Sequence, residues 1–261
     1  MGSVMSDAVA LENITVGYGR QVAIHDVHAH FETGSLTAVA GPNGSGKSTL
    51  LKAIAGILKP SKGHIHIDPA LKNHIAYLPQ TSFIRRDFPM PVLQAVCCGF
   101  WKTVGEGRTI DHEMEIRARA ALAEVGLENL EDRQIGSLSG GQFQRVLFAR
   151  TIVEDAKIIL LDEPFTAVDA ETTARLINVI LDWHKQGRTV ICVMHDLMLI
   201  RKYFPESVVL AGRCIGRGHT HDMFRQKLLS FDLDMAELYT DGKDIPAPRS
   251  RPCDHDGHDH A

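Results

Sequence analysis

The stretch at residues 41–49, GPNGSGKST, constrains this 261-residue chain more than any other. It follows the short apolar run LTAVA at 36–40 and precedes the helical pattern TLLKAIAGIL. It therefore matches G-x-x-x-x-G-K-[ST] in the strand, loop and helix setting that this pattern requires. Its glycines let the backbone wrap closely around phosphate groups, so that backbone N–H groups and the helix N-terminus face the negative charge. The stretch predicts a loop that binds nucleotide phosphates.

Residues in this loop and in a second stretch predict a catalytic magnesium site. We expect Lys47 to reach the β and γ phosphate oxygens and Ser48 to hold Mg²⁺. The stretch IILLDEP at 158–164 ends an apolar run with Asp162, which can support the magnesium shell, and Glu163, which can deprotonate an attacking water. The alternative for Glu163 is a surface side chain that caps the strand end. The candidate nucleotide-binding residues are Gly41, Pro42, Asn43, Gly44, Ser45, Gly46, Lys47, Ser48 and Thr49.

Short apolar runs alternate with helical patterns along the chain. The runs that predict strands are at 11–16, 36–40, 75–79, 158–164 and 189–196. The clearest helical pattern, at 170–187, has Asp169 as a candidate N-cap and Gly187 at its end. One face of this helix is predicted to carry Ala174, Ile177, Leu181 and His184. Because strands alternate with helices, the sequence predicts an α/β fold with a parallel sheet covered on both faces.

The pattern of strands stops between about 91 and 153. The stretch DHEMEIRARAALAEVGL places apolar residues at helical spacing, and these are Met114, Ala118, Ala121, Leu122 and Val125. The sequence therefore predicts a helical insertion in a single domain that spans 9–240. Residues 241–261 are rich in proline, charge, histidine and aspartate without an apolar period, so we expect a flexible tail there.

The stretch SLSGGQFQRVLFAR at 137–150 supplies a second candidate anion site. Ser139, Gly140 and Gly141 open a helix, and a helix N-terminus favours negative charge. One nucleotide needs only one such cradle. The second is explained when two copies of the chain pair head to tail, each closing on the nucleotide held by the other. The sequence therefore predicts a head-to-tail homodimer with nucleotide held between its subunits.

An ordered set of motifs resembles the nucleotide-binding subunit of ATP-binding cassette (ABC) transporters. The set consists of Tyr18, GPNGSGKST, Gln80 in YLPQ, LSGGQ, LLDEP, Asp169 in TAVD and His195 in VMHD. It covers residues from about 9 to 235, and LSGGQ is specific to ABC-type ATPases. The resemblance implies a P-loop, RecA-like parallel sheet core with an N-terminal antiparallel β subdomain and an ABC-type helical subdomain insertion. The chain departs from the family at TAVD, where SALD is more common, and at Phe143, where a polar residue is common.

The same resemblance implies a role for each residue of the set. Tyr18 stacks on adenine, for which an aromatic ring offers a flat apolar face. Glu163 is the catalytic base, His195 contacts the γ-phosphate, and Gln80 senses magnesium and water. The Mg²⁺ ligands are then Ser48, Gln80 and Asp162. The residues that act on the partner's ATP are Ser139, Gly140, Gly141 and Gln142, and Asp169 lies at the dimer seam.

A chain of this kind resembles a separate subunit that docks on an integral membrane permease. The stretch RRDFPMPVLQAVCCGFW at 85–101 is similar to that of ATPase subunits of zinc and manganese importers, where a Phe-Pro pair precedes a helix near the permease contact. The alternative is that Phe88 packs in the core of the insertion. The resemblance implies ATP hydrolysis that powers import of zinc or manganese, with an extracytoplasmic metal-binding protein as an indirect partner. The competing interpretations are an ABC transporter ATPase for another cargo and an ABC ATPase of translation or DNA maintenance. A small-molecule P-loop kinase fits less well, because such an enzyme would have no LSGGQ.

The tail CDHDGHDHA adds a candidate Zn²⁺ site, since thiolate and imidazole are good zinc ligands. Its candidate ligands are Cys253, His255, His258 and His260. The alternative is a solvated acidic tail that binds metal only incidentally, because short histidine-rich tracts are compositional signals.

Composition limits the remaining classes of function. The formal net charge of -4 argues against binding of nucleic acid through phosphate neutralisation. The five cysteines have no zinc-finger spacing, which favours buried free thiols in a reducing compartment. No stretch reaches the roughly 18 apolar residues of a membrane span. We therefore expect a peripheral protein on the cytoplasmic face of the cell membrane.

Overall fold

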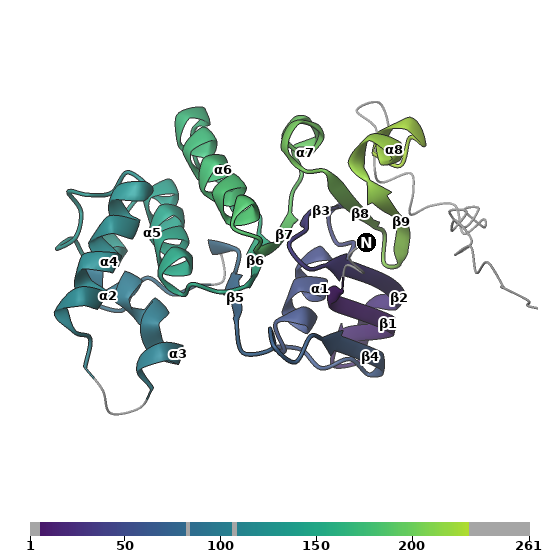
Figure 1. The fold of residues 1–261 in the computed structure, drawn as a ribbon, viewed down its shortest axis with the longest axis horizontal. Coiled ribbons are helices and arrows are strands. Elements are labelled where there is room, and N and C mark those ends of the chain that lie inside the picture. The colour runs from purple at the N-terminus through teal and green to yellow at the C-terminus, as the bar shows by residue number, and fades with distance from the viewer. Residues whose placement is uncertain (1–5, 82–83, 106–108, 230–261) are drawn as a thin grey trace, which may run out of the picture.

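The computed structural model describes residues 6–81, 84–105 and 109–229, which form two sheets with eight α-helices and short 3₁₀ helices around them (Figure 1). The strands are β1 Asp7–Tyr18, β2 Gln21–Glu32, β3 Leu36–Ala40, β4 Lys62–Ile67, β5 Ile75–Leu78, β6 Ile158–Asp162, β7 Thr189–Val193, β8 Glu206–Leu210 and β9 Cys214–His219. The helices are α1 Lys47–Ile54, α2 Val92–Cys97, α3 Trp101–Val104, α4 His112–Glu124, α5 Gly140–Val153, α6 Ala170–Lys185, α7 Leu197–Tyr203 and α8 Thr220–Arg225. Short 3₁₀ helices lie at Cys98–Phe100 and Ile135–Ser137.

The larger sheet has the strand order β5-β6-β7-β3-β8-β9. Its first five strands are parallel, which confirms the predicted parallel core, whereas β9 pairs with β8 in the antiparallel sense. Every residue of β3, β6 and β7 is buried, as expected for parallel strands that are covered on both faces. Because β7 lies between β3 and β6, the loops that follow these three strands meet at one edge of the sheet.

The smaller sheet has the order β2-β1-β4 and is antiparallel, which confirms the N-terminal antiparallel unit. Its inner face packs with α1 against one face of the larger sheet, in an apolar cluster that includes Phe31, Leu50 and Leu160. The residue patterns predicted only 11–16 as a strand here. The residue patterns did not predict β2 and β4 because polar residues, several of them histidines, occupy many of the exposed positions of these strands.

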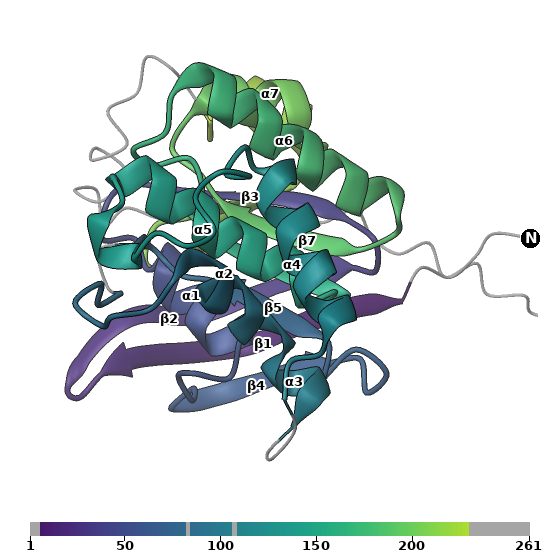
Figure 2. The same cartoon turned by 90° about the vertical axis from the view of Figure 1, so that its left-hand side faces the viewer.

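Helices α2 to α5 form the predicted helical region and lie at the opposite end of the molecule from the smaller sheet (Figures 1 and 2). Ala118, Ala121, Leu122 and Val125 of the α4 segment are buried as predicted, and Met114 is partly buried against the same cluster. Phe148 of α5 stacks on Trp183 of α6 with ring centroids 5.3 Å apart. This contact ties the helical region to the helices that cover the larger sheet.

Two predictions from the sequence are wrong in detail. Helix α6 begins after its N-cap Asp169 and ends just before Gly187 as predicted, but Ala174 is exposed and the buried face centres on Leu176, Ile180 and Trp183. The packing against α5 selects this face. The expectation of buried thiols holds for Cys97 and Cys192, whereas Cys214 is half-buried and Cys98 is exposed.

In the described ranges, no helix has the length and apolar character to cross a membrane.

Candidate nucleotide-binding and hydrolysis site

A cleft of about 1140 Å³ opens where the loops after β3, β6 and β7 meet. Its floor is the loop and first turn of α1 at 43–49, and one wall is the turn between β1 and β2. Gln80, Glu163 and His195 line it from the other side. The cleft therefore gathers residues 43–49 of the first motif and the three predicted catalytic side chains. The start of β2 adds Gln21, Val22, Ala23 and His25, which sequence reasoning missed because only the pairing of β1 with β2 brings them here.

Two glycines of the 41–49 loop have backbone conformations that a side chain would disrupt. Gly46, the N-cap of α1, has φ of 92° and a Cβ atom there would overlap the side chain of Ile24. Gly41 has φ of 153° and a Cβ atom there would overlap the carbonyl oxygen of Leu210. The N–H groups of the first turn of α1 have no acceptor within the helix. The loop therefore forms a tight cradle of backbone donors, which suits a chain of phosphates.

Lys47 and Ser45 place further polar atoms inside this cradle. The Lys47 Nζ atom is buried and donates hydrogen bonds to the carbonyl oxygens of Gly41 and Pro42 at 2.9 and 2.8 Å. Burial lowers the pKa of the Lys47 ammonium. The hydroxyl of Ser45 is buried without a hydrogen-bond partner. A buried polar group without a partner is costly, so a ligand that brings oxygen atoms to this loop would relieve that cost.

Ser48 and Tyr77 both donate to the carboxylate of Asp162. The Ser48 hydroxyl lies 2.9 Å from Asp162 Oδ1, and the Tyr77 hydroxyl lies 3.2 Å from Oδ2. Burial raises the pKa of Asp162, which is 1% exposed, although both hydrogen bonds act in the opposite direction. Burial and the neighbouring carboxylate also raise the pKa of Tyr77, so its hydroxyl remains a donor. Hydroxyl and carboxylate oxygens are ligands that Mg²⁺ accepts.

Sequence reasoning missed Tyr77. The signal available was a tyrosine in the run IAYL, one residue before the end of the strand that leads to Gln80. Only the pairing of β5 with β6, which sets Tyr77 opposite Leu160, shows that its hydroxyl reaches Asp162.

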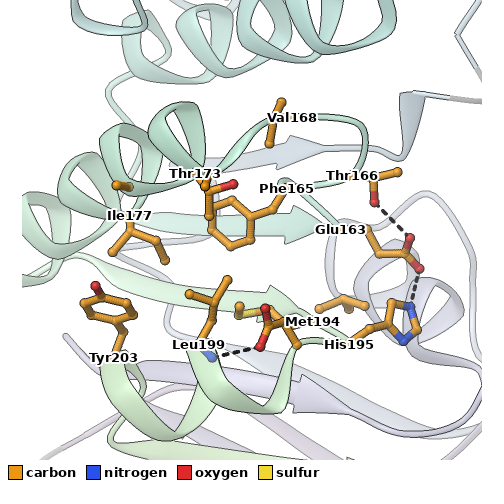
Figure 3. Close-up of a pocket in the computed structure, with 14 residues that line it drawn as sticks. Glu163, Phe165, Thr166, Val168, Thr173, Ile177, Met194, His195, Leu199 and Tyr203 are labelled. Carbon is orange, nitrogen blue, oxygen red and sulfur yellow. Dashed lines mark hydrogen bonds and ion pairs between the residues drawn. The ribbon is translucent and has the colours of Figure 1, made fainter.

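Glu163 lines the cleft and is the centre of a hydrogen-bond network. Figure 3, a close-up of an adjoining pocket that Glu163 also lines, shows its contacts with Thr166 and His195. Its Oε1 atom is 2.7 Å from His195 Nε2, and its Oε2 atom accepts from Gln80 Nε2 at 3.1 Å and from Thr166 Oγ1 at 3.4 Å. Because an ionised carboxylate only accepts, Nε2 of His195 carries the proton in this contact. Glu163 has φ of 51°, a left-handed conformation that is uncommon outside glycine and frequent at functional sites. The alternative of a simple strand cap does not account for these three polar contacts.

Tyr18 lies at the outer rim of the cleft, at the end of β1. Its side chain is 49% exposed, and Lys52 Nζ lies 5.8 Å from the centre of its ring. An exposed aromatic ring beside a phosphate cradle offers a stacking surface to a base.

The residues of LSGGQ lie outside the cleft, at the start of α5. Ser139 caps α5 by accepting from Gln142 N at 3.2 Å, and the Gln142 side chain accepts from Ser139 N at 3.0 Å, which forms a capping box. None of the residues that line the described cleft belongs to this helix start. A Cβ atom at Gly141 would lie 2.6 Å from the Ala167 carbonyl oxygen, so LSGGQ packs against the loop that leads to Asp169.

Asp169 lies in that same loop and caps α6. Its Oδ1 atom accepts from Thr172 N at 2.7 Å, and this bond holds the pKa of Asp169 below its ordinary value. Phe143, which departs from the family pattern, is buried beneath the guanidinium of Arg86 at 4.4 Å and does not face solvent. By contrast Phe88 is 63% exposed, so the alternative that it packs in the core of the insertion is wrong.

Comparison with known proteins identifies the family. The family model described as "ABC transporter" matches residues 24–166. The chain belongs to this family. The zinc transport system ATP-binding protein TroB of Treponema pallidum is 37% identical to this ABC chain over 86% of each protein. The manganese transport system ATP-binding protein MntB of Bacillus subtilis is 37% identical over 83% of this chain and 88% of that protein. A bacterial ABC transporter cassette solved as a dimer has a TM-score of 0.72 and 26% identity, with 81% of this chain and 98% of that chain covered.

The residues of this ABC chain fit ATP and Mg²⁺. The glycine cradle, the Ser45 hydroxyl without a partner and the first turn of α1 suit phosphate oxygens. The donor set of Ser48, Gln80 and Asp162 consists of hydroxyl, amide and carboxylate, which suits a hard cation. In the part of the chain that the structure describes, no three histidine, cysteine, aspartate or glutamate side chains converge on one point. The tail candidates Cys253, His255, His258 and His260 lie outside the described residues.

Proposed function

We propose that this chain is the ATP-hydrolysing subunit that powers import of a divalent transition metal, zinc or manganese, through a separate membrane permease. The observation that carries the proposed ATP hydrolysis is the convergence of Ser48, Glu163 and His195 on one cleft beside a phosphate cradle, with the Asp162 carboxylate hydrogen-bonded to Ser48. The family supports ATP as the nucleotide, since the relatives are named as ATP-binding proteins of metal transport systems.

In this proposal, each side chain of the cleft has one task. Tyr18 stacks on adenine, and the nine residues of 41–49 hold the phosphates. Ser48, Gln80 and Asp162 would hold Mg²⁺, which would supply neutralisation of the phosphate charge. Glu163 takes the proton of the attacking water. Its central place in the hydrogen-bond network supports this role. The proton on His195 Nε2 is available to the γ-phosphate once the ring turns away from Glu163.

The proposed active unit is a head-to-tail homodimer. Ser139, Gly140, Gly141 and Gln142 are held ready at the start of α5 but do not line the cleft of their own chain, which supports action on the partner's ATP. Asp169 is proposed to lie at the seam, because its loop contacts Gly141. We further propose that 9–240 is one ATPase domain, that α2 to α5 face the permease, and that the exposed Phe88 is part of that contact. This assembly puts the chain on the cytoplasmic face of the membrane, with an extracytoplasmic metal-binding protein as an indirect partner.

Uptake measurements test the cargo. Cells that lack this chain are complemented with the wild type or with Glu163→Gln, and uptake of radiolabelled zinc and manganese is compared. We expect wild type but not Glu163→Gln to restore uptake of one of the two ions. Restoration of neither ion, with normal ATP hydrolysis by the purified chain, would refute metal import and leave an ABC ATPase for another cargo.

The tail is proposed to bind Zn²⁺ through Cys253, His255, His258 and His260, on the strength of their chemistry alone. Deletion of 250–261 is expected to lower the zinc bound per chain and to leave basal ATP hydrolysis unchanged, since the predicted nucleotide and catalytic residues all lie between Tyr18 and His195. Equal zinc binding with and without these residues would refute the tail site.

A further inference from the structure

The outer face of the smaller sheet carries histidines that the nucleotide site does not use. On β4, His64 and His66 alternate with half-buried residues, so both imidazoles lie on the solvent side. On β2, His28 is exposed at the corresponding outer position. None of these histidines lines the nucleotide cleft. Any polar residues would suit an exposed strand face, and solvent exposure alone does not require several imidazoles. The repeated histidines therefore raise the question of whether this surface binds a specific ligand.

A carboxylate on the central strand faces the two histidines of β4. Glu12 of β1 pairs directly with His64, and Ala10 pairs with His66. Directly opposed side chains in an antiparallel pair have Cβ atoms about 5 Å apart, and diagonal neighbours remain within reach of a long side chain. Glu12 bridges that diagonal, because its Oε2 atom lies 3.4 Å from His66 Nε2. The rings of His64 and His66 have centroids 6.1 Å apart.

We propose that Glu12, His64 and His66 form a surface site for Zn²⁺ or a cation of similar chemistry. Two imidazoles and one carboxylate are a donor set that zinc accepts in four-coordinate sites, with water as the fourth ligand, whereas Mg²⁺ and Ca²⁺ prefer oxygen donors alone. The His-x-His spacing on a strand directs both rings to the same side, and the paired strand supplies the third donor.

The three side chains are free to gather around a cation. In the described residues they do not yet converge on one point, and only Glu12 and His66 are in contact. His66 and Glu12 have side chains that are 60% and 58% exposed, and His64 is exposed as well. Rotation of exposed side chains meets little packing, so the backbone of the two strands provides the fixed framework and the cation orders the rings.

Zinc binding to the full-length chain, measured by isothermal titration without nucleotide or magnesium, tests the site. The tail ligands are first removed by Cys253→Ser, His255→Ala, His258→Ala and His260→Ala, so that the remaining zinc reports on the folded part. We expect this variant to bind one Zn²⁺ per chain and to lose it with His64→Ala and His66→Ala added. His221→Ala, which removes an exposed histidine of α8, is the matched control and should leave binding unchanged. Equal zinc binding with and without His64 and His66 would overturn the proposal.

A conservative change at Glu12 separates ligation from folding. Glu12→Gln keeps the size of the side chain but removes its charge, and we expect zinc affinity to fall at least about tenfold, since loss of even an indirect partner of a metal ligand costs that much. Melting temperature and ATP hydrolysis in magnesium should stay at wild-type values, because all three side chains lie outside the cleft. Unchanged affinity in Glu12→Gln would exclude the carboxylate as a ligand. Zinc binding here needs neither ATP nor a permease, so its failure would leave the proposed transport function untouched.

Discussion

His195 Nε2 lies 2.7 Å from Glu163 Oε1, and the two side chains follow neighbouring parallel strands of the larger sheet. In this contact the proton of His195 is directed at the carboxylate that we propose as the base. A γ-phosphate oxygen in the cleft would compete for that proton, which would release Glu163 to accept one from water. We therefore propose that this contact links occupancy of the cleft by nucleotide to activation of the base.

Removal of the charge at Glu163 tests this role. Glu163→Gln preserves shape and removes the proton acceptor, so we expect ATP hydrolysis to fall about 10²–10⁴-fold while ATP still binds and holds the chain as a dimer. Turnover is measured by phosphate release, and the dimer by size-exclusion chromatography with ATP. Glu171→Gln, in the exposed first turn of α6, is the control and should hydrolyse ATP normally. Normal hydrolysis by Glu163→Gln would exclude it as the base.

Tyr77 is expected to act through Asp162 as a positioning residue. Tyr77→Phe removes one of the two hydroxyl donors to this buried carboxylate, at a cost of about 1 kcal/mol in the free energy of unfolding. A less fixed carboxylate should raise the Mg²⁺ concentration needed for half-maximal hydrolysis several-fold, with little change at saturating Mg²⁺. Tyr203→Phe, which removes a tyrosine hydroxyl of α7 outside the nucleotide cleft, is the control and should leave the magnesium dependence unchanged. If Tyr77→Phe and wild type showed the same magnesium dependence, Tyr77 would not position Asp162 and would serve only in packing.

Gly46 is expected to tolerate no side chain. Gly46 and Gly56 have similar positive φ of 92° and 74°, but only at Gly46 would a Cβ atom overlap a neighbour, the side chain of Ile24. Gly46→Ala should therefore lower the free energy of unfolding by about 1–3 kcal/mol more than Gly56→Ala, and it should abolish ATP binding by displacing the loop. Urea denaturation and binding of a fluorescent ATP analogue measure the two effects. Equal stability of both variants would contradict the predicted overlap.

Ser139 has a structural role that can be separated from its proposed catalytic one. Ser139→Ala removes the N-cap of α5, and Asp111→Ala removes the N-cap of α4, where Oδ1 accepts from Met114 N at 2.9 Å. Each loss should cost about 1 kcal/mol in the free energy of unfolding. Only Ser139→Ala is expected to lose ATP hydrolysis, because only Ser139 is proposed to reach the partner's nucleotide. Comparable hydrolysis by the two variants would remove Ser139 from the proposed active site.

The parts of the fold that depend on neighbours in sequence could be predicted from the sequence. The strand before the 41–49 loop, the N-caps at Ser139 and Asp169, and the helix end at Gly187 follow from backbone geometry and local hydrogen bonds, and the structure has all of them. The family could be recognised for the same reason, since its motifs are short and their spacing is visible along the chain.

Tertiary contacts decided what local patterns leave open. The pairing of β5 with β6 sets the Tyr77 hydroxyl against Asp162, and packing on Phe148 turns α6 so that Trp183 is buried and Ala174 is not. The pairing of β1 with β4 sets Glu12 beside the histidines at 64 and 66. The sequence by itself determined the family and the residue types of its nucleotide site, because each motif carries its own local geometry. Only the tertiary structure decided which side chains meet, because strand register and helix rotation depend on partners far away along the chain.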